Sequence, residues 1–350
     1  MDSRTPLTEA LARVARVALI DAPTPIQPLK RIEEVMGPEL NGVKLYAKRE
    51  DLLGLGGGGN KLRKLEYLMG EAAATGCDTL IATGGLQSNF TRVVAAACAR
   101  QKVSCELVLA PLVPETDEDY QRNGNILLDD LFGAKSHILG QGEVAADFAA
   151  RRARELTAQG QRPFLTPGGG SSPMSALGYV RCALELDAQL SSAGLDDAVI
   201  VLPNGSNGTH AGLLAGFKAL GLPPGRLQAF TVLAKAENSR SATLAMANRT
   251  LELLGLHERL GIDDVQVADD QRGQGYGLIT DAMLAAVRLM ASCEGLLLDP
   301  VYSGKAFAGM LANVRSGRYP VGSSVVFLMT GGTPALFAYR NAFARQVLRS

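Results

Sequence analysis

The chain has 350 residues, an apolar content of 47%, and 35 basic and 35 acidic side chains. This length predicts two domains or one large α/β unit, and the apolar content predicts a globular protein. A formal net charge of zero, without long runs of one sign, excludes the basic surface typical of nucleic-acid-binding proteins. We therefore expect a small-molecule partner.

The N-terminal residues indicate where in the cell the protein is found, and the cysteines and histidines indicate whether it has disulfides or a metal site. Residues 1–6 lack the apolar run of a signal peptide, and no segment approaches the roughly 20 apolar residues of a membrane span, so a cytoplasmic protein without membrane contact is expected. The five cysteines are scattered and form no CxxC pair, which favours free, mostly buried thiols. The three histidines have no metal-ligand spacing, so we predict no metal site.

A glycine turn with the sequence GGGGNK, residues 56–61, leads into a predicted helix. Glycine has no side-chain bulk, so a flat ligand can approach the backbone closely. The amine of Lys61 can form a Schiff base with a carbonyl compound if its surroundings lower its pKa from about 10.4. The alternative, for the turn taken alone, is a surface loop with a solvated lysine.

Short β-type runs alternate with longer helical patterns from about residue 78 onward, which is typical of a parallel-sheet α/β protein. Ligands of such sheets bind beyond the carboxyl ends of the strands. The predicted strands are residues 79–83, 105–109, 163–166, 198–202, 229–233 and 324–329.

The loops after four of these strands combine glycine with hydroxyl or amide residues, and we expect them to converge on one pocket. In the loop 204–209, glycines expose N–H groups, Ser206 and Thr209 add hydroxyls, and a helix begins, which together predict a site for a single phosphate. A structural N-cap explains Ser206 or Thr209 equally well. The spacing matches neither a dinucleotide fingerprint nor a Walker A loop.

The reactive lysine, the phosphate loop and the further strand ends together resemble fold-type II pyridoxal-phosphate enzymes, the tryptophan-synthase-β-like group. Within that group the chain resembles the 1-aminocyclopropane-1-carboxylate (ACC) deaminase/D-cysteine desulfhydrase family. The matching blocks occur in order over nearly the whole chain and begin at residues 48, 59, 87, 177, 208, 276, 299, 304 and 331.

This resemblance implies an α/β architecture of two open, twisted, parallel-sheet domains with pyridoxal 5'-phosphate in the cleft between them. The large, cofactor-binding domain is expected to comprise residues 1–62 and 171–350, and the small inserted domain residues 63–170. The resemblance also implies a homodimer.

Four residues match catalytic positions of the family. Lys61 matches the lysine that holds the cofactor as a Schiff base and moves protons at the substrate carbons. Ser88 lies in the block that meets the substrate carboxylate, at a predicted helix start where an anion is favoured. Tyr276 and Tyr302 match two active-site tyrosines, although a tyrosine taken alone more often serves packing.

The cofactor-binding positions surround the same loops. Lys64 and the loop 206–209 match phosphate-binding positions, and Asn89 matches the residue that bonds the ring hydroxyl of the cofactor. The full predicted set is Lys61, Lys64, Asn89, Ser206, Asn207, Gly208, Thr209, Ser303 and Thr330.

Two of these positions indicate the desulfhydrase branch. ACC deaminases resemble DPVYEGK and carry leucine before the late Gly-Gly, whereas this chain has Ser303 and Thr330 at those places. A carboxylate near the pyridine nitrogen keeps it protonated, and a hydroxyl does so less. The resulting prediction is a β-eliminating carbon–sulfur lyase that converts D-cysteine into pyruvate, ammonia and sulfide. The alternatives are L-cysteate sulfo-lyase, ACC deaminase and a non-catalytic pyridoxal-phosphate carrier.

Three positions depart from the family pattern. Phe90 stands where the desulfhydrase block QSNH has histidine, Met329 replaces a histidine often found before Thr-Gly-Gly, and Asn207 stands where alanine is common. Neither histidine position is expected to hold the cofactor, so these departures concern the identity of the substrate.

Overall fold

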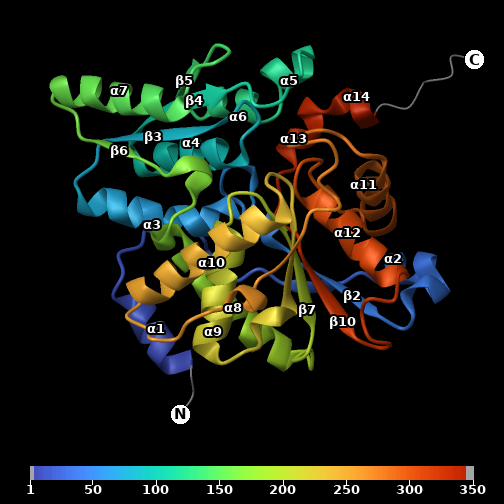
Figure 1. Cartoon of the computed structure of the whole chain (residues 1–350). Helices are drawn as coiled ribbons and strands as arrows, with labels where there is room; N and C mark the ends of the chain where they lie inside the picture. Colours follow the sequence, from blue (N-terminus) through green and yellow to red (C-terminus); the bar gives the residue numbers. More distant parts are fainter. Residues whose placement is uncertain (1–3, 344–350) are drawn as a thin grey trace, which may run out of the picture.

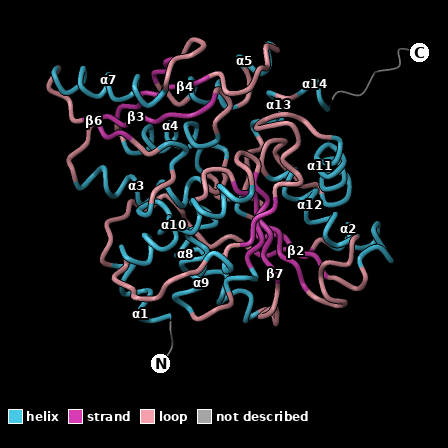
Figure 2. The backbone as a smooth tube through the Cα atoms, in the orientation of Figure 1, coloured by secondary structure: helices cyan, strands magenta, loops and turns pink. Residues whose placement is uncertain are grey.

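Two separate β-sheets organise the chain, and the computed structural model describes residues 4–343 of it (Figures 1 and 2). The strands are β1 (Ile26–Pro28), β2 (Lys44–Lys48), β3 (Thr79–Gly85), β4 (Ser104–Ala110), β5 (Lys135–Ile138), β6 (Pro163–Leu165), β7 (Val199–Asn204), β8 (Leu227–Thr231), β9 (Gln266–Ala268) and β10 (Ser324–Leu328). The large sheet has the order β1-β2-β10-β7-β8-β9, and the small sheet has the order β5-β4-β3-β6. All neighbouring strands are parallel except β1 and β2.

The helices connect these parallel strands and cover the faces of both sheets. They are α1 (Arg4–Ala12), α2 (Lys30–Met36), α3 (Lys61–Ala74), α4 (Asn89–Gln101), α5 (Glu118–Arg122), α6 (Asn125–Leu131), α7 (Ala145–Ala158), α8 (Pro173–Ser192), α9 (Gly208–Leu220), α10 (Ala236–Leu253), α11 (Asp281–Glu294), α12 (Ser303–Arg315), α13 (Pro334–Ala338) and α14 (Arg340–Phe343).

All six predicted strands are present, each within two residues of its predicted limits. The structure adds four strands that the sequence pattern did not reveal. β1 and β9 have three residues each and lie at the edges of the large sheet, so their patterns are too short to recognise. β5 lies at the edge of the small sheet and is mostly exposed, and β2 begins and ends with lysine, which hides its apolar alternation.

The small sheet is covered on both faces, as expected for a parallel sheet. Helix α7 packs on one face, where Ile81 and Val108 of the sheet meet Ala149 and Leu156 of the helix. Helix α4 covers the opposite face and lies between this sheet and the rest of the molecule (Figure 1).

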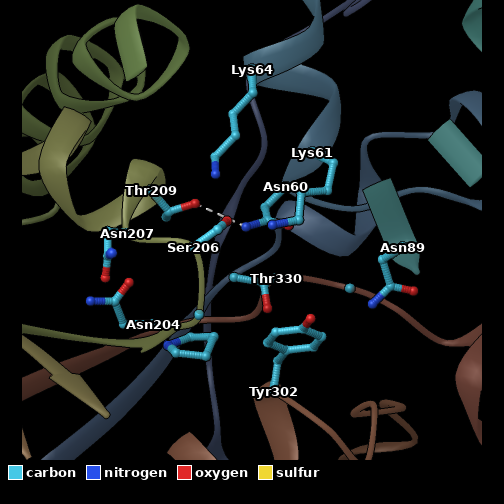
Figure 3. Close-up of a pocket in the computed structure, with 13 residues that line it drawn as sticks. Asn60, Lys61, Lys64, Asn89, Asn204, Ser206, Asn207, Thr209, Tyr302 and Thr330 are labelled. Atoms are coloured by element: carbon cyan, nitrogen blue, oxygen red, sulfur yellow. Dashed lines mark hydrogen bonds between the residues drawn. The ribbon is translucent and has the colours of Figure 1, made fainter. Parts of the chain in front are cut away.

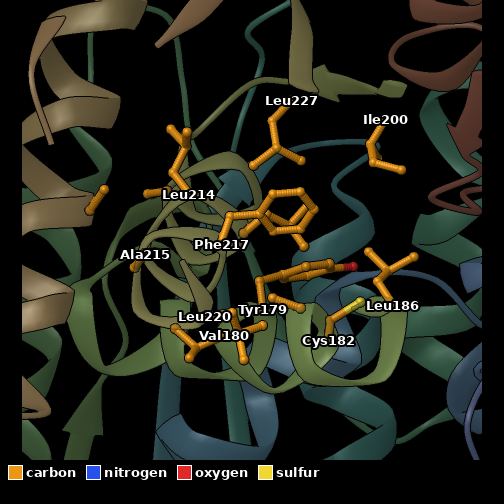
Figure 4. Close-up of a cluster of buried hydrophobic side chains, with 14 of the residues drawn as sticks. Tyr179, Val180, Cys182, Leu186, Ile200, Leu214, Ala215, Phe217, Leu220 and Leu227 are labelled. Carbon is orange, nitrogen blue, oxygen red and sulfur yellow. The ribbon is translucent and has the colours of Figure 1, made fainter. Parts of the chain in front are cut away.

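Two apolar clusters enclose the large sheet. One cluster joins the sheet to α8 and α9, where Tyr179 and Phe217 are fully buried beside Ile200 and Leu227 (Figure 4). The other joins the opposite face to α2, α11 and α12, with Phe307 and Phe327 in edge-to-face contact.

Strands β3 to β6 all lie within the predicted small domain, and the other strands lie outside it. The predicted boundary at residue 62 falls inside α3, which packs against α8 so closely that a Cβ on Gly178 would lie 2.0 Å from the carbonyl oxygen of Arg63. The domain limits therefore stay a prediction. Residues 1–3 and 344–350 of the predicted large domain lie outside the described residues.

A buried ion network contacts the first turn of α3 through Arg63. Glu50 is fully buried and accepts hydrogen bonds from Arg63 Nε (2.5 Å), Arg63 Nη2 (2.8 Å), Thr24 Oγ1 (2.6 Å) and Tyr179 Oη (2.9 Å). Arg63 also pairs with Glu185 at 3.0 Å, and Glu185 pairs with the buried Lys48. These contacts of Arg63 therefore hold the first turn of α3 in place.

Three sequence expectations concern the molecule as a whole. Within residues 4–343, no helix is both long and apolar enough to cross a membrane, and no group of three or more His, Cys, Asp or Glu side chains is placed to hold a metal ion. All five cysteines are free, but only Cys98 and Cys182 are buried. The expectation of mostly buried thiols is therefore wrong for the other three, which lie nearer the surface.

Candidate active site

One polar pocket receives the ends of several loops that the sequence analysis grouped together (Figure 3). The loops after β3, β7 and β10 each contribute to its wall. The loop after β6 reaches the pocket through a hydrogen bond between Ser171 and Ser206. The lining residues of the pocket are Asn60, Lys61, Lys64, Asn89, Pro203, Asn204, Gly205, Ser206, Asn207, Thr209, Tyr302, Thr330 and Gly331.

The glycine turn 56–59 precedes α3 and has positive φ at all four residues, from 64° to 112°. Its glycines make room for protein atoms rather than for a flat ligand. A Cβ on Gly58 would lie 2.4 Å from the carbonyl oxygen of Asp51, and one on Gly56 would lie 2.5 Å from Ala96 Cβ. The turn requires glycine because neighbouring parts of the chain approach it closely, and not, as expected from the sequence, because a flat ligand does.

Lys61 is the first residue of α3 and points into the pocket (Figure 3). Burial lowers its pKa from 10.5 to about 8, although the negative charge of Asp299 and a hydrogen bond with Lys64 act in the opposite direction. Lys61 Nζ lies 6.0 Å from the centre of the Tyr302 ring. An appreciable neutral fraction makes this amine a nucleophile near neutral pH.

Lys64, one helical turn further on, heads a chain of hydrogen bonds. Its Nζ donates to Ser171 Oγ at 2.8 Å, and Ser171 Oγ donates to Ser206 Oγ at 2.8 Å. Burial, together with the charge of Lys61, lowers the pKa of Lys64 well below its usual range. Two buried amines side by side favour an anion as their ligand.

The loop after β7 forms a cradle at the N-terminus of α9. Asn207 is the N-cap residue in the left-handed conformation (φ 65°), which asparagine tolerates better than most residues. Its side chain accepts hydrogen bonds from Ser239 and Thr243 of α10, at 3.1 and 3.3 Å. These two hydrogen bonds attach the Asn207 side chain to α10. Asparagine, where alanine is common in the family, therefore fits the left-handed backbone conformation of the loop.

Gly208 begins α9 and lies against Lys64, since a Cβ on Gly208 would be 2.8 Å from Lys64 Nζ. Thr209 accepts a hydrogen bond from Asn60 Nδ2 at 3.0 Å, which joins the cradle to the residue before Lys61. The predicted phosphate site thus combines a helix N-terminus, hydroxyl groups and a lysine.

Helix α4 starts at the opposite side of the pocket from the cradle. Asn89 lines the pocket, and its Oδ1 accepts a hydrogen bond from Asn125 at 3.0 Å. Ser88 is the N-cap of α4, and its Oγ accepts from the backbone N–H groups of Phe90 and Thr91 at 3.2 and 3.3 Å. The Ser88 hydroxyl hydrogen stays available for another acceptor.

Tyr302 lines the pocket, and its hydroxyl lies 2.6 Å from that of Tyr276. Burial raises the pKa of both tyrosines, so both are neutral at physiological pH. Lys305 Nζ donates to the carbonyl oxygens of Arg272 and Gly275, at 2.8 and 3.2 Å, and so holds the loop that carries Tyr276.

Ser303 is fully buried and is not one of the pocket-lining residues. Its Oγ donates to Asp299 Oδ1 at 2.5 Å, while Asp299 also accepts from backbone N–H groups at the start of α12. Thr330 lines the pocket, and its carbonyl oxygen accepts from Asn60 N at 3.0 Å. Asp299 is thus a buried carboxylate beside the pocket that sequence reasoning did not single out.

Comparison with known proteins identifies the family of the chain. The family model described as "Pyridoxal-phosphate dependent enzyme" matches residues 17–331. The chain belongs to this family. Its fold is accordingly that of the fold-type II pyridoxal-phosphate enzymes, in agreement with the sequence prediction.

Curated relatives and solved structures agree with this membership. The chain is 39% identical to a D-cysteine desulfhydrase of Yersinia enterocolitica over 333 residues, which is 95% of this chain and 98% of the relative. A D-cysteine desulfhydrase of Salmonella newport is also 39% identical, over 330 residues that cover 94% and 97% of the two chains. The solved structure of an ACC deaminase homologue aligns with a TM-score of 0.85 at 33% identity and covers 97% of this chain and 98% of its own.

The residues present fit pyridoxal phosphate. The cradle at α9 and the buried Lys64 suit a phosphate, because both favour negative charge and neither is paired with a carboxylate among the described residues. Lys61, with its lowered pKa, lies at the same pocket and suits the aldehyde of the cofactor. Asn89 lies across the pocket, where an amide can bond a ring hydroxyl.

Three further residues at the site were not predicted. Ser171 joins Lys64 to Ser206, Asn60 joins the lysine turn to Thr209, and Asn204 lines the pocket while bonding Ser239 and Thr243. Ser171 lies in the loop after β6 and Asn204 is the last residue of β7, so their position at the carboxyl end of a strand was a usable signal.

Phe90 and Met329, which replace two histidines of the family, lie outside the pocket lining. Phe90 is buried, and its ring packs on Gly170, where a Cβ would lie 2.2 Å from the ring. Met329 is buried in the cluster that includes α12 and β10.

Proposed function

We propose that the protein is a β-eliminating lyase that converts D-cysteine and water into pyruvate, ammonia and hydrogen sulfide. The observation that carries this proposal is the amine of Lys61, which has a lowered pKa and lies 6.0 Å from the centre of the Tyr302 ring in a pocket whose residues fit pyridoxal phosphate. The two relatives named D-cysteine desulfhydrase, 39% identical over nearly the full length, support D-cysteine as the substrate.

Lys61 would hold the cofactor through its amine, and the same amine, when free, would take the proton from the substrate α-carbon. Bound pyridoxal phosphate supplies the electron sink that makes this proton acidic. The residues that would hold its phosphate are Lys64, Ser206, Thr209 and the backbone N–H groups at Asn207 and Gly208.

Residues on the opposite wall handle the substrate and its leaving group. Ser88 donates its hydroxyl hydrogen to the substrate carboxylate, while Asn89 bonds the ring hydroxyl of the cofactor. Tyr276 and Tyr302 share one hydrogen bond, so one hydroxyl hydrogen stays available to protonate the departing sulfur. Their raised pKa values keep both phenols protonated for this task.

Asp299 orients Ser303, whose position matches the glutamate of ACC deaminases. The Ser303 hydroxyl donates to Asp299 Oδ1 and accepts from the backbone N–H of Asp299, at 2.5 and 2.8 Å. ACC deaminase is the second candidate, since a solved ACC deaminase homologue is 33% identical with a TM-score of 0.85. Ser303 and Thr330 favour the first candidate.

The products distinguish the candidate activities. Purified, cofactor-loaded protein is incubated with D-cysteine, L-cysteine, L-cysteate, D-serine and ACC, and sulfide, sulfite, pyruvate and 2-oxobutanoate are quantified. We expect equal amounts of sulfide and pyruvate from D-cysteine and little 2-oxobutanoate from ACC. Release of sulfite from L-cysteate, or of 2-oxobutanoate from ACC, without sulfide from D-cysteine would replace the proposal with the corresponding alternative.

Ser88→Ala provides a test of the substrate carboxylate site. We expect kcat/KM for D-cysteine to fall about 10- to 100-fold, because a hydrogen bond to a charged group is lost. The visible absorption of the bound cofactor should stay, since its predicted contacts lie elsewhere. Ser88→Thr, which keeps the hydroxyl and the N-cap, is the control. Loss of cofactor from Ser88→Ala would instead make Ser88 a cofactor-binding or structural residue.

The proposal includes a cytoplasmic homodimer, as the family resemblance implies. Sedimentation velocity of the cofactor-loaded protein measures the assembly directly. A mass near twice the 36.8 kDa of the chain is expected, and a single species at the monomer mass would contradict the homodimer.

A further inference from the structure

Arg92 is a completely buried arginine in the first turns of α4, and the catalytic roles above do not use it. Its Nη1 donates to the carbonyl oxygen of Gly56, and its Nη2 donates to that of Gly58 at 2.9 Å. Both acceptors belong to the glycine turn that precedes Lys61. A buried cation is therefore held by the backbone of the turn that starts α3.

The charge of Arg92 has little direct compensation. No carboxylate within residues 4–343 forms an ion pair with it, and its Nε has no hydrogen-bond partner there. Asp129 of α6 is the acidic group near enough to favour its charged form, and both Asp129 carboxylate oxygens are buried without a described partner. Burying such a cation costs free energy, which stability alone does not explain.

The glycine turn is shaped to fit Arg92 and its helix. A Cβ on Gly57 would lie 2.9 Å from Arg92 Nη1, and one on Gly56 would lie 2.5 Å from Ala96 Cβ. On its other side the turn meets the end of β10, because a Cβ on Gly59 would lie 3.0 Å from the carbonyl oxygen of Thr330. The turn is thus clamped between α4 and the large sheet.

Arg92 consequently links two helix starts that face each other across the pocket. Helix α3 begins with Lys61, three residues after Gly58, and α4 begins with Asn89, three residues before Arg92, with Ser88 as its N-cap. We propose that Arg92 is a positioning residue, whose two hydrogen bonds to the glycine turn set the distance between Lys61 Nζ and the groups at the start of α4. This inference rests on the proposed role of Lys61.

Arg92→Met, which keeps the length of the side chain without its charge, tests the inference in the cofactor-loaded protein. A misplacement of Lys61 by about 1 Å is expected to lower kcat about 100-fold, with KM changed less than about threefold. The pH midpoint of the visible absorption band should also shift, by about half a unit, because the surroundings of the lysine-bound cofactor change. Arg92→Lys, which reaches one carbonyl oxygen, is expected to restore about a tenth of the activity.

Cys98→Ala is the matched control, since Cys98 is buried on the same helix and does not touch the turn. It should lower the melting temperature while kcat and the absorption midpoint stay unchanged. Arg92→Met with unchanged kcat and midpoint would overturn the inference, and so would a Cys98→Ala variant that loses kcat in proportion to its stability. If Arg92→Met does not fold, kcat and the absorption midpoint are measured on Arg92→Lys instead. An Arg92→Lys variant with full kcat and an unchanged midpoint would then overturn the inference. The absorption midpoint requires no D-cysteine turnover, so failure of the proposed substrate stays distinguishable.

Discussion

Lys61→Ala is expected to abolish the visible absorption of the bound cofactor and to lower turnover of D-cysteine by about 10³-fold or more. The substitution removes both the covalent attachment and the base that moves the α-proton, and each is a large contribution to the rate. Absorption spectra and sulfide release, measured on protein loaded with excess pyridoxal phosphate, provide the test.

Lys64→Ala is the matched control, because Lys64 lies one turn away on the same helix and is buried beside Lys61. It should weaken cofactor binding by about 10- to 100-fold, since one charge-assisted contact to the phosphate is lost. At saturating pyridoxal phosphate its absorption band and most of its turnover should return. A Lys61→Ala variant that keeps the band, together with a Lys64→Ala variant that loses it, would reverse the two assignments.

Glu50→Gln is expected to lower the free energy of unfolding by about 3 kcal/mol, because it leaves Arg63 buried without its main counter-charge. Glu50 is fully buried, and burial alone would raise its pKa, but Arg63, Lys48 and Thr24 lower it from 4.5 to about 2. The depressed pKa means that the unfolded chain binds a proton more readily than the folded chain below pH 4.5. The contribution of Glu50 is therefore complete above about pH 4.5 and is lost as the pH falls toward 2.

Urea unfolding of Glu50→Gln and of the unaltered protein, followed at several pH values, measures this contribution. The difference between the two should shrink as the pH is lowered from 5 toward 3. Glu34→Gln, which removes half of the exposed pair with Arg31, serves as the control and should change stability by less than about 0.5 kcal/mol. A difference for Glu50→Gln that is small at pH 7, or that grows in acid, would contradict the linkage.

The parts of the fold that sequence reasoning predicted are those with strong local signals. Strands such as β3 and β7 are continuous apolar runs followed by a glycine or amide loop, so their type and their carboxyl ends could be recognised. Because parallel strands bring such ends to one edge, the meeting of Lys61, Ser206 and Thr330 at one pocket could be predicted. Strands β1 and β9 lacked enough residues for any pattern.

The missed features depend on contacts between distant segments. Glu50 and Arg63 are charged residues that read as surface positions, and only the packing of α3 against α8 shows that both are buried. Arg92 lies 34 residues from Gly58, with which it shares a hydrogen bond, and no local pattern indicates that pairing. The glycine turn was recognised, but the reason for its glycines lies in Asp51 and Ala96 rather than in a ligand.

The attachment site of the cofactor is the claim on which the proposed chemistry depends most directly. The cofactor-loaded protein is treated with borohydride, which makes a lysine–cofactor linkage permanent, and is then digested and analysed by mass spectrometry. We expect the pyridoxyl group on Lys61, in a peptide that includes the glycine turn 56–59. A pyridoxyl group on Lys64, or on any other lysine while Lys61 stays unmodified, would contradict the account.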